Sequence, residues 1–265
     1  MNRLKNIKLF LFDMDGTLYI GDRLYDFTKE MLAAIKGQGK KYMYMTNNSS
    51  KSVKDYIAKL NKLGIEACEE EFITSSQATA YYLKMKYPNE AIYVCGTQSL
   101  KEEFIKEGFT LTESIEDTGL IVMGNDTELT FKKLRDVCQI LLTKENVKYV
   151  ATNLDMVCPT EFGCVPDCGS FCDMIYNCTG RRPELVGKPE PIMPQLAMEK
   201  TGCSKSETAV IGDRIYTDVK SGLNAGTLSV LVMSGETTEE ILEKSSDKPH
   251  LVLKDCGEIT KALCE

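Results

Sequence analysis

Residues 9–18 read Leu9-Phe10-Leu11-Phe12-Asp13-Met14-Asp15-Gly16-Thr17-Leu18, an apolar run that ends in two aspartates and a glycine. A short apolar run of this kind predicts a buried strand. Side chains two residues apart in an extended segment share a face, so we expect Asp13 and Asp15 to lie together at the carboxyl end of this strand. In open α/β sheets, ligands bind at this end of the strands.

The two carboxylates predict either a metal site or a polar turn. Close carboxylates repel each other, and a bound Mg²⁺ would relieve the repulsion because hard cations prefer oxygen ligands. One carboxylate could then act as a nucleophile and the other as a general acid and base. The alternative is a strand followed by an Asp-Gly turn in which both acids are solvated.

Composition and charge exclude several classes of partner. The chain has 265 residues, which suits one large domain or two modest ones, with 43% hydrophobic and 27% charged residues. A net charge of −7 argues against a nucleic-acid-binding protein, whose binding surface is basic. No apolar run approaches the roughly 18 residues of a membrane span. Basic residues near the N-terminus precede only the short run at 9–12, which is too short for a signal peptide, so we expect a cytoplasmic protein with no membrane partner.

Cysteine and histidine usage argues against other kinds of site. None of the 11 cysteines forms a CxxC pair, and disulfides are not expected in a reducing cytosol. Cys164, Cys168 and Cys172 recur every four residues, so on a helix they would share a face, either as a metal or redox cluster or as buried thiols. His250 is the only histidine, which disfavours Ser-His-Asp catalysis and histidine-rich metal sites.

Apolar runs alternate with helical patterns along the chain, which predicts a doubly wound α/β fold, a parallel sheet with helices on both faces. Residues 53–63 and 131–141 carry apolar side chains at helical spacing, and we expect both apolar stripes in the core. Ser49 and Ser50 are the expected N-caps of the first of these helices. The expected strands are residues 7–12, 41–45, 91–95, 119–123, 147–151, 208–211, 228–232 and 251–253.

We expect a core domain that is interrupted by an inserted domain. Soft boundaries lie near residues 75–77 and 181–183, which gives core segments 1–76 and 185–265 around an insertion at 77–184. The reason for this division is chemical, because the groups able to complete the site around Asp13 and Asp15 lie on both sides of the middle third.

Three further motifs follow short apolar runs. The stretch Thr46-Asn47-Asn48-Ser49-Ser50 offers hydroxyls, amides and helix N-terminal N–H groups that suit a phosphate oxygen. Lys188, between Gly187 and Pro189, can neutralise phosphate charge or steady a nucleophilic carboxylate. Asp213 can join Asp13 at one cation, and Asp218 can hydrogen-bond the ligands. Each motif alone has an ordinary alternative: a polar N-cap, a solvated lysine, or a surface turn with a capping acid.

Together, D-x-D-G-T, T-N-N, G-K-P and G-D-x-x-x-x-D after successive apolar runs resemble the haloacid dehalogenase superfamily of phosphohydrolases. The insertion resembles the type-2 cap of class IIA. T-N-N and V-G-K-P resemble the NagD-like subgroup of sugar-phosphate, p-nitrophenyl-phosphate and pyridoxal-phosphate phosphatases. Residues 122–126 and 151–153 resemble segments of the cap in that subgroup. The resemblance spans about residue 8 to residue 232.

The resemblance implies a Rossmann-like core with a smaller α/β cap and a Mg²⁺-dependent phosphomonoesterase. It implies that Asp13 is the nucleophile, which forms an aspartyl-phosphate, and that Asp15 is the acid and base. Thr46 and Asn47 would hold the transferring phosphoryl group, and Lys188 would stabilise it. The residues implied for Mg²⁺ are Asp13, Asp15 through its backbone carbonyl, and Asp213, with Asp218 nearby.

The loop after residues 147–151 is expected to face the catalytic aspartates. Its Asn153, Asp155 and Met156 are candidates to contact the leaving group, with an outward-facing polar turn as the alternative. The loop at 152–166 lacks the histidine associated with the pyridoxal-phosphate enzymes, so that substrate is not supported. The expected partner is a small phosphorylated metabolite. Caps of this type often provide a dimer surface in the resembling family, so the resemblance also implies a homodimer through the cap.

Two other functions share some of these motifs. A phospho-accepting receiver domain also combines acids, a Ser or Thr and a Lys on a doubly wound sheet, but receivers are single small domains, and Asp15 would shorten the life of the acyl phosphate. A phosphomutase of the same superfamily is the other alternative. Release of inorganic phosphate distinguishes a phosphatase from both.

Overall fold

The computed structural model describes residues 2–160 and 162–264, and the chain divides into two compact units. Unit 1 comprises the chain up to Thr46, Tyr56–Ile73, and the chain from Lys188 on. Unit 2 comprises Asn47–Asp55 and Thr74–Gly187. The segment expected as an insertion, 77–184, therefore lies within unit 2, which also takes in Asn47–Asp55.

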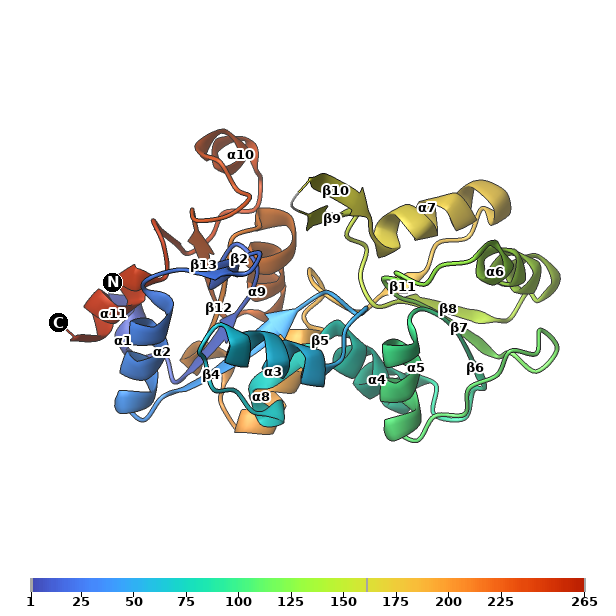
Figure 1. The fold of residues 1–265 in the computed structure, drawn as a ribbon, viewed down its shortest axis with the longest axis horizontal. Helices are drawn as coiled ribbons and strands as arrows, with labels where there is room; N and C mark the ends of the chain where they lie inside the picture. Colours follow the sequence, from blue (N-terminus) through green and yellow to red (C-terminus); the bar gives the residue numbers. More distant parts are fainter. Residues whose placement is uncertain (1, 161, 265) are drawn as a thin grey trace. The chain divides into compact units, whose positions relative to one another are not determined.

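Unit 1 is built on a sheet with the strand order β14-β13-β12-β1-β4-β5. Figure 1 labels four of these strands, β4, β5, β12 and β13. The strand β1 pairs in parallel with β12 and β4, β12 with β13, and β13 with β14. Parallel strands are buried on both faces, which explains why all four side chains of β1 are fully buried and apolar. The strands are β1 (Leu9–Phe12), β4 (Lys41–Thr46), β5 (Phe72–Thr74), β12 (Thr208–Gly212), β13 (Leu228–Val232) and β14 (Leu251–Leu253).

Two groups of helices cover this sheet. In the first group, α2 packs against β4 and α11, and α11 packs against α1; in the second, α8 packs against β1, and α9 packs against β12 and β13. A small hairpin of β2 (Tyr19–Ile20) and β3 (Arg23–Leu24) follows β1. The helices of unit 1 are α1 (Asn2–Lys5), α2 (Thr28–Gly37), α3 (Val53–Lys62), which begins in the unit 2 segment, α8 (Ile192–Thr201), α9 (Lys220–Ala225), α10 (Glu239–Lys244) and α11 (Gly257–Cys264), with 3-10 turns at Glu69–Glu71 and Lys205–Glu207.

Unit 2 has its own parallel sheet, with the order β11-β8-β7-β6, and a separate antiparallel hairpin of β9 and β10. A core of apolar residues from this sheet packs against α6 and α7. Its strands are β6 (Ile92–Cys95), β7 (Leu120–Met123), β8 (Lys148–Ala151), β9 (Val157–Thr160), β10 (Gly163–Pro166) and β11 (Glu184–Leu185). Its helices are α4 (Ser75–Lys86), α5 (Gln98–Lys106), α6 (Phe131–Thr143) and α7 (Cys168–Thr179).

Each strand expected from the sequence is confirmed to within two residues at either end, and so is the α/β fold with parallel sheets. The helix at 53–63 is also confirmed, but its expected N-caps are wrong. The hydroxyl of Ser49 accepts the backbone N–H of Asn125, and Ser50 bonds to Asn48 instead. The capping hydroxyl belongs to Ser52, which accepts the backbone N–H of Asp55 at 3.3 Å.

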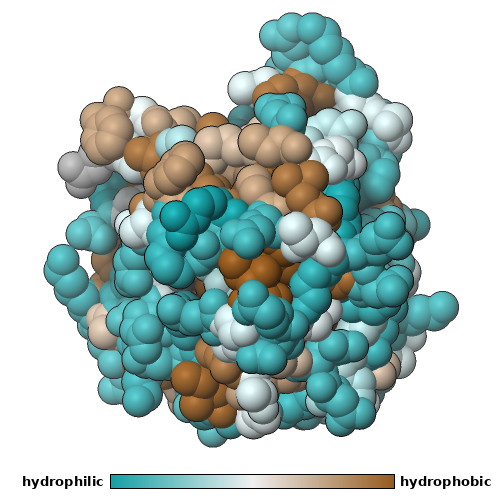
Figure 2. Space-filling view, turned by 90° about the vertical axis from the view of Figure 1, so that its right-hand side faces the viewer, coloured by the Kyte–Doolittle hydropathy of each residue, from teal (hydrophilic) through white to brown (hydrophobic). Residues whose placement is uncertain are grey.

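Two other expectations about unit 2 need correction. Phe131 begins α6 but is 81% exposed, so the apolar stripe of this helix packs against the core only from Leu134 on. Figure 2 shows the right-hand side of the view in Figure 1, where hydrophobic residues form separate patches among hydrophilic ones. Cys164 lies exposed in β10, whereas Cys168 and Cys172 are buried on α7, so the three cysteines do not share a helix face.

The cysteines that the structure describes behave as buried or surface thiols. All of them are free, and none belongs to a group able to hold a metal among the described residues. Cys168 and Cys172 pack in the apolar core of unit 2, and burial raises the pKa of the Cys168 thiol. Over the described ranges, no helix combines the length and apolar character that crossing a bilayer requires.

Candidate active site

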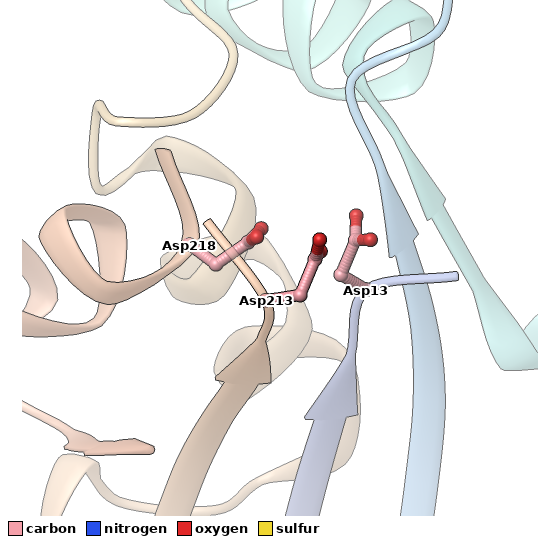
Figure 3. A group of neighbouring side chains, drawn as sticks. All are labelled: Asp13, Asp213 and Asp218. Carbon is pink, nitrogen blue, oxygen red and sulfur yellow. The ribbon is translucent and has the colours of Figure 1, made fainter. Parts of the chain in front are cut away.

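Two aspartates stand next to each other because they follow neighbouring parallel strands. Asp13 comes directly after β1 and Asp213 directly after β12, and these strands pair with each other. Asp218 comes from the π-helical turn Ile215–Val219, one element later. Ligand oxygens of the three carboxylates lie within 4.8 Å of one another. Figure 3 shows all three carboxylates beyond the ends of the strands, at one edge of the sheet.

Lys188 holds two of these aspartates together. Its Nζ donates hydrogen bonds to Asp13 Oδ1 at 2.5 Å, to Asp218 Oδ1 at 2.6 Å and to the backbone carbonyl of Met45 at 3.3 Å. The Lys188 side chain is only 3% exposed, so its charge is balanced by the carboxylates and not by water. The three N–H donors of the ammonium match these three acceptors, which fixes the lysine in one position.

The cluster carries more negative than positive charge. Asp13, Asp213 and Asp218 bring three carboxylates, whereas Lys188 brings one ammonium. Burial raises the pKa of Asp13 to about 8, although the attraction of Lys188 opposes this rise. Burial and the negative charge of Asp218 together raise the pKa of Asp213 to about 6. Burial also disfavours the charged form of Lys188, but Asp13 and Asp218 outweigh it and raise its pKa. A buried excess of negative charge favours the binding of a cation.

One oxygen of Asp213 is suited to hold that cation. Asp213 Oδ2 accepts the backbone N–H of Glu236 at 2.7 Å, whereas Oδ1 is buried and has no hydrogen-bond partner. A buried carboxylate oxygen without a donor is unfavourable unless a cation or water meets it. The donor set consists of oxygen alone, with no sulfur or imidazole, and this is the chemistry that Mg²⁺ prefers. The residues present therefore fit the metal expected from the sequence.

Asp15 lies in the tight turn that follows β1. The backbone N–H of Gly16 donates to the carbonyl of Tyr19 at 2.8 Å, which closes the turn. Gly16 has a φ of +81°, and a Cβ at this position would lie 2.5 Å from Asp213 Oδ2, so only glycine lets the turn pass the aspartate. The Asp15 side chain is exposed, and the group of side chains able to hold a metal consists of Asp13, Asp213 and Asp218.

Sequence reasoning missed the loop after β13 that closes around Asp213. Ser234 Oγ donates to the backbone carbonyl of Gly16 at 2.8 Å, and the N–H of Glu236 holds Asp213 as described. Arg214 Nε pairs with Glu236 Oε2 at 2.8 Å. The signal available in the sequence is a polar stretch that directly follows a predicted strand. Such stretches are common, so it did not single out this loop.

The two residues expected to hold phosphate stand where the chain passes from unit 1 into unit 2. Thr46 ends β4 in unit 1, and Asn47 is the first residue of unit 2. Within unit 2 the backbone carbonyl of Asn47 accepts hydrogen bonds from Ser75 Oγ at 2.6 Å and from Asn153 Nδ2 at 3.1 Å. The side-chain Nδ2 of Asn47 donates to Asp155 Oδ2 at 3.1 Å. The structure thus brings Asn47 together with two of the three leaving-group candidates.

Those three candidates differ in exposure. Asn153 is fully buried, Asp155 is half-buried and Met156 is 49% exposed. Asn153 Nδ2 lies 3.5 Å from Asp155 Oδ2 and 3.4 Å from Asp167 Oδ1, so its side chain is packed inside unit 2. Of the three, Met156 alone presents an exposed side chain.

Family models match both parts of the chain. A haloacid dehalogenase-like hydrolase model matches residues 10–110, and a HAD-hydrolase-like model matches residues 185–259. The first match contains Asp13, Thr46 and Asn47, and the second contains Lys188 and Asp213.

Similar proteins align over almost the whole chain. An acid sugar phosphatase from Staphylococcus saprophyticus is 34% identical over 98% of this chain and 99% of its own. A 5'-nucleotidase, YutF, from Bacillus subtilis is 34% identical over 93% of this chain and 94% of its own. The crystal structure of a 4-nitrophenylphosphatase from Thermotoga maritima superposes with a TM-score of 0.93 at 39% identity, over 98% of this chain and 99% of that one. All three names describe hydrolysis of phosphoric esters.

Proposed function

This chain belongs to the haloacid dehalogenase-like hydrolases, and we propose that it hydrolyses small phosphorylated metabolites with Mg²⁺ through an aspartyl-phosphate intermediate. Its relatives place it in the NagD-like subgroup with a type-2 cap, and it is a phosphomonoester hydrolase. The observation that carries the finer proposal is the position of Asp13. It stands at a strand end, hydrogen-bonded to a buried lysine and beside two further carboxylates.

Asp13 is the proposed nucleophile. A bond forms between a carboxylate oxygen of Asp13 and phosphorus while the bond from phosphorus to the alcohol oxygen breaks. Lys188 keeps the carboxylate in place through its hydrogen bond to Oδ1, and its charge opposes the build-up of negative charge in the transition state. Asp218 in turn holds Lys188 at 2.6 Å, so it acts through the lysine.

Asp15 is the proposed acid and base. Its exposed side chain can give a proton to the departing alcohol and then take one from the water that hydrolyses the aspartyl-phosphate. The first step yields the free alcohol, and the second yields inorganic phosphate and free Asp13.

Asp13, Asp213 and the backbone carbonyl of Asp15 are proposed to hold Mg²⁺, with Asp218 nearby. When bound, the metal would neutralise charge on the transferring phosphoryl group and on the acidic cluster. Asp213 is already oriented for this role, since the N–H of Glu236 fixes Oδ2 and leaves Oδ1 available.

The substrate class rests on the relatives and on unit 2. The names of the relatives include a sugar phosphatase, a 5'-nucleotidase and a 4-nitrophenylphosphatase, which share the phosphoryl group and differ in the alcohol. We therefore propose a site that is specific for the phosphoryl group and tolerant of the leaving group, with the exposed Met156 as a contact for the alcohol.

A homodimer through unit 2 remains part of the proposal, and light scattering of the purified protein tests it.

A phosphate-release screen tests the proposed function. The purified protein is incubated with Mg²⁺ and some tens of phosphomonoesters, including p-nitrophenyl phosphate, sugar phosphates and nucleoside monophosphates. We expect inorganic phosphate from several of them. Isomerised sugar phosphate without release of inorganic phosphate would point to a phosphomutase, and a stable phosphoprotein without turnover would point to a receiver.

A further inference from the structure

We propose that Asp155 is a positioning residue: it fixes the side-chain amide of Asn47 for phosphoryl binding and does not select the leaving group. The inference rests on the proposed function, in which Asn47 helps to hold the transferring phosphoryl group. Asp155 lies 108 positions after Asn47 in the sequence, in the loop that follows β8. Its Oδ2 accepts a hydrogen bond from Asn47 Nδ2 at 3.1 Å.

Asn47 is held from several sides within unit 2. Ser75 Oγ, at the start of α4, and Asn153 Nδ2 both donate to its backbone carbonyl, at 2.6 Å and 3.1 Å. Gly187 lies so close that a Cβ there would be 2.7 Å from Asn47 Oδ1. The backbone and the oxygen side of the amide are therefore confined by neighbours, and Asp155 supplies the contact on the nitrogen side.

The carboxylate of Asp155 decides which way the amide faces. If the Asn47 amide turned over, its oxygen would face the negatively charged Asp155 Oδ2, which repels it. In the observed orientation one N–H of Nδ2 makes a charge-assisted hydrogen bond to Asp155. The second N–H of the same planar group is then held in a fixed direction, which is the preorganisation that phosphoryl binding needs.

The position of Asn47 in the chain gives this contact its consequence. Asn47 directly follows Thr46, the last residue of β4, and β4 pairs with β1, the strand that directly precedes Asp13. A residue that orients Asn47 thus acts on a group attached to the end of the strand beside the nucleophile. Asp155 is half-buried and bonded to Asn47, whereas the next residue, Met156, is exposed. Neighbouring residues of one loop are therefore assigned different tasks.

The two roles for Asp155 predict different kinetics. A residue that selects the leaving group changes the ranking of substrates when it is removed. Removing a residue that orients a phosphoryl-binding amide lowers kcat/KM for every substrate by a similar factor, because all substrates share the phosphoryl group. The same removal also weakens inhibition by inorganic phosphate, which has no leaving group at all.

The experiment compares five variants with the wild type: Asp155→Ala, Asp155→Asn, Asn47→Ala, the double variant Asp155→Ala/Asn47→Ala, and the control Asp117→Ala. Asp117 is an exposed acid elsewhere in unit 2. kcat/KM is measured on at least four esters with different alcohols, together with the inhibition constant of inorganic phosphate. Thermal melts of every variant separate loss of fold from loss of function.

We expect Asp155→Ala to lower kcat/KM on the order of 10- to 100-fold on all esters and to weaken phosphate inhibition, with Asp117→Ala unchanged. Asp155→Asn should keep most of the activity that Asp155→Ala loses, since its amide oxygen can still accept a hydrogen bond from Asn47 Nδ2. The double variant should be no less active than Asn47→Ala, because both changes remove the same function.

Three results would overturn the inference. They are a changed substrate ranking with unaltered phosphate inhibition in Asp155→Ala, additive effects in the double variant, and a melting temperature that falls as far in Asp155→Asn as in Asp155→Ala without recovery of activity. Each of these leaves the proposed function standing if the wild type still releases phosphate. A wild type that hydrolyses none of the esters instead contradicts the proposed function, and the role of Asp155 with it.

Discussion

Lys188 and Asp13 are separated by 175 positions in the sequence, yet Lys188 Nζ lies 2.5 Å from Asp13 Oδ1. Asp218 Oδ1 accepts a second hydrogen bond from the same nitrogen at 2.6 Å. The lysine is buried, and its positive charge lies within hydrogen-bond reach of two of the acids in the site. The stability of the site and its proposed chemistry both depend on this one ammonium group.

Replacing Lys188 should therefore affect stability and activity together. Lys188→Met leaves buried carboxylates without their partner, a loss that typically costs about 3–5 kcal/mol. Urea unfolding measures this cost, and phosphate release should fall to background in the same variant. The control is Lys261→Met, which changes an exposed lysine of α11. Equal stabilities of the two variants would show that Lys188 is not the partner the cluster needs.

Magnesium should stabilise the protein through Asp213. The cluster has three carboxylates and one ammonium, and the buried Asp213 Oδ1 has no donor, so a divalent cation should bind the folded state. At a concentration one hundred times its dissociation constant, a ligand adds about 2.7 kcal/mol. Melts with EDTA and with Mg²⁺ should differ clearly in the wild type and much less in Asp213→Asn. Activity should disappear with chelation, and full activity after exhaustive chelation would remove the metal from the account.

Without metal, Asp13→Asn should melt at a higher temperature than the wild type. The substitution keeps the shape of the side chain and removes one of the mutually repelling charges, which a cation no longer balances. The comparison uses EDTA-treated samples at about pH 9, above the pKa of about 8 to which burial raises Asp13, so that the wild-type carboxyl is charged. Saturating Mg²⁺ should reverse the order, because the wild type gains more from the cation. A variant that melts lower under both conditions would mean that the contact with Lys188 outweighs the repulsion.

Gly187 should tolerate no side chain. A Cβ at Gly187 would lie 2.3 Å from the carbonyl oxygen of Thr152 and 2.7 Å from Asn47 Oδ1. Gly187→Ala should therefore lower the melting temperature and kcat/KM together, since the clash displaces Asn47. The matched control is Gly37→Ala at the end of α2, where a Cβ meets nothing within 4 Å. That change should be neutral or stabilising by about 0.5–1 kcal/mol. Similar melts of the two variants would refute the close packing at Gly187.

The sequence predicts the sheet well because its strands are buried on both faces. Continuous apolar runs such as Leu9–Phe12 have few other interpretations, and the acids after them mark one edge of a parallel sheet. Asp13, Asp213, Asp218 and Lys188 could therefore be named before their contacts were known. Their residue types and their positions after strands carry this information locally.

Other features could not be predicted because they depend on contacts between distant segments. The Ser52-x-x-Asp55 spacing is a local capping signal for Ser52, but the bond that occupies the Ser49 hydroxyl comes from the distant backbone N–H of Asn125. The hairpin of β9 and β10 has no alternating apolar pattern, and its strands are largely exposed. The bond from Asn47 to Asp155 joins two polar residues of ordinary appearance, so only the fold reveals that they meet.

The proposed mechanism depends most directly on Asp13 as the nucleophile. Phosphate release from p-nitrophenyl phosphate with saturating Mg²⁺ is measured for the wild type, for Asp13→Asn and for Asp26→Asn, which changes an exposed aspartate of unit 1. Circular dichroism and melting confirm that each variant is folded. We predict that Asp26→Asn matches the wild type, while Asp13→Asn is folded and releases no phosphate above background. Wild-type turnover by a folded Asp13→Asn protein would contradict the proposed mechanism.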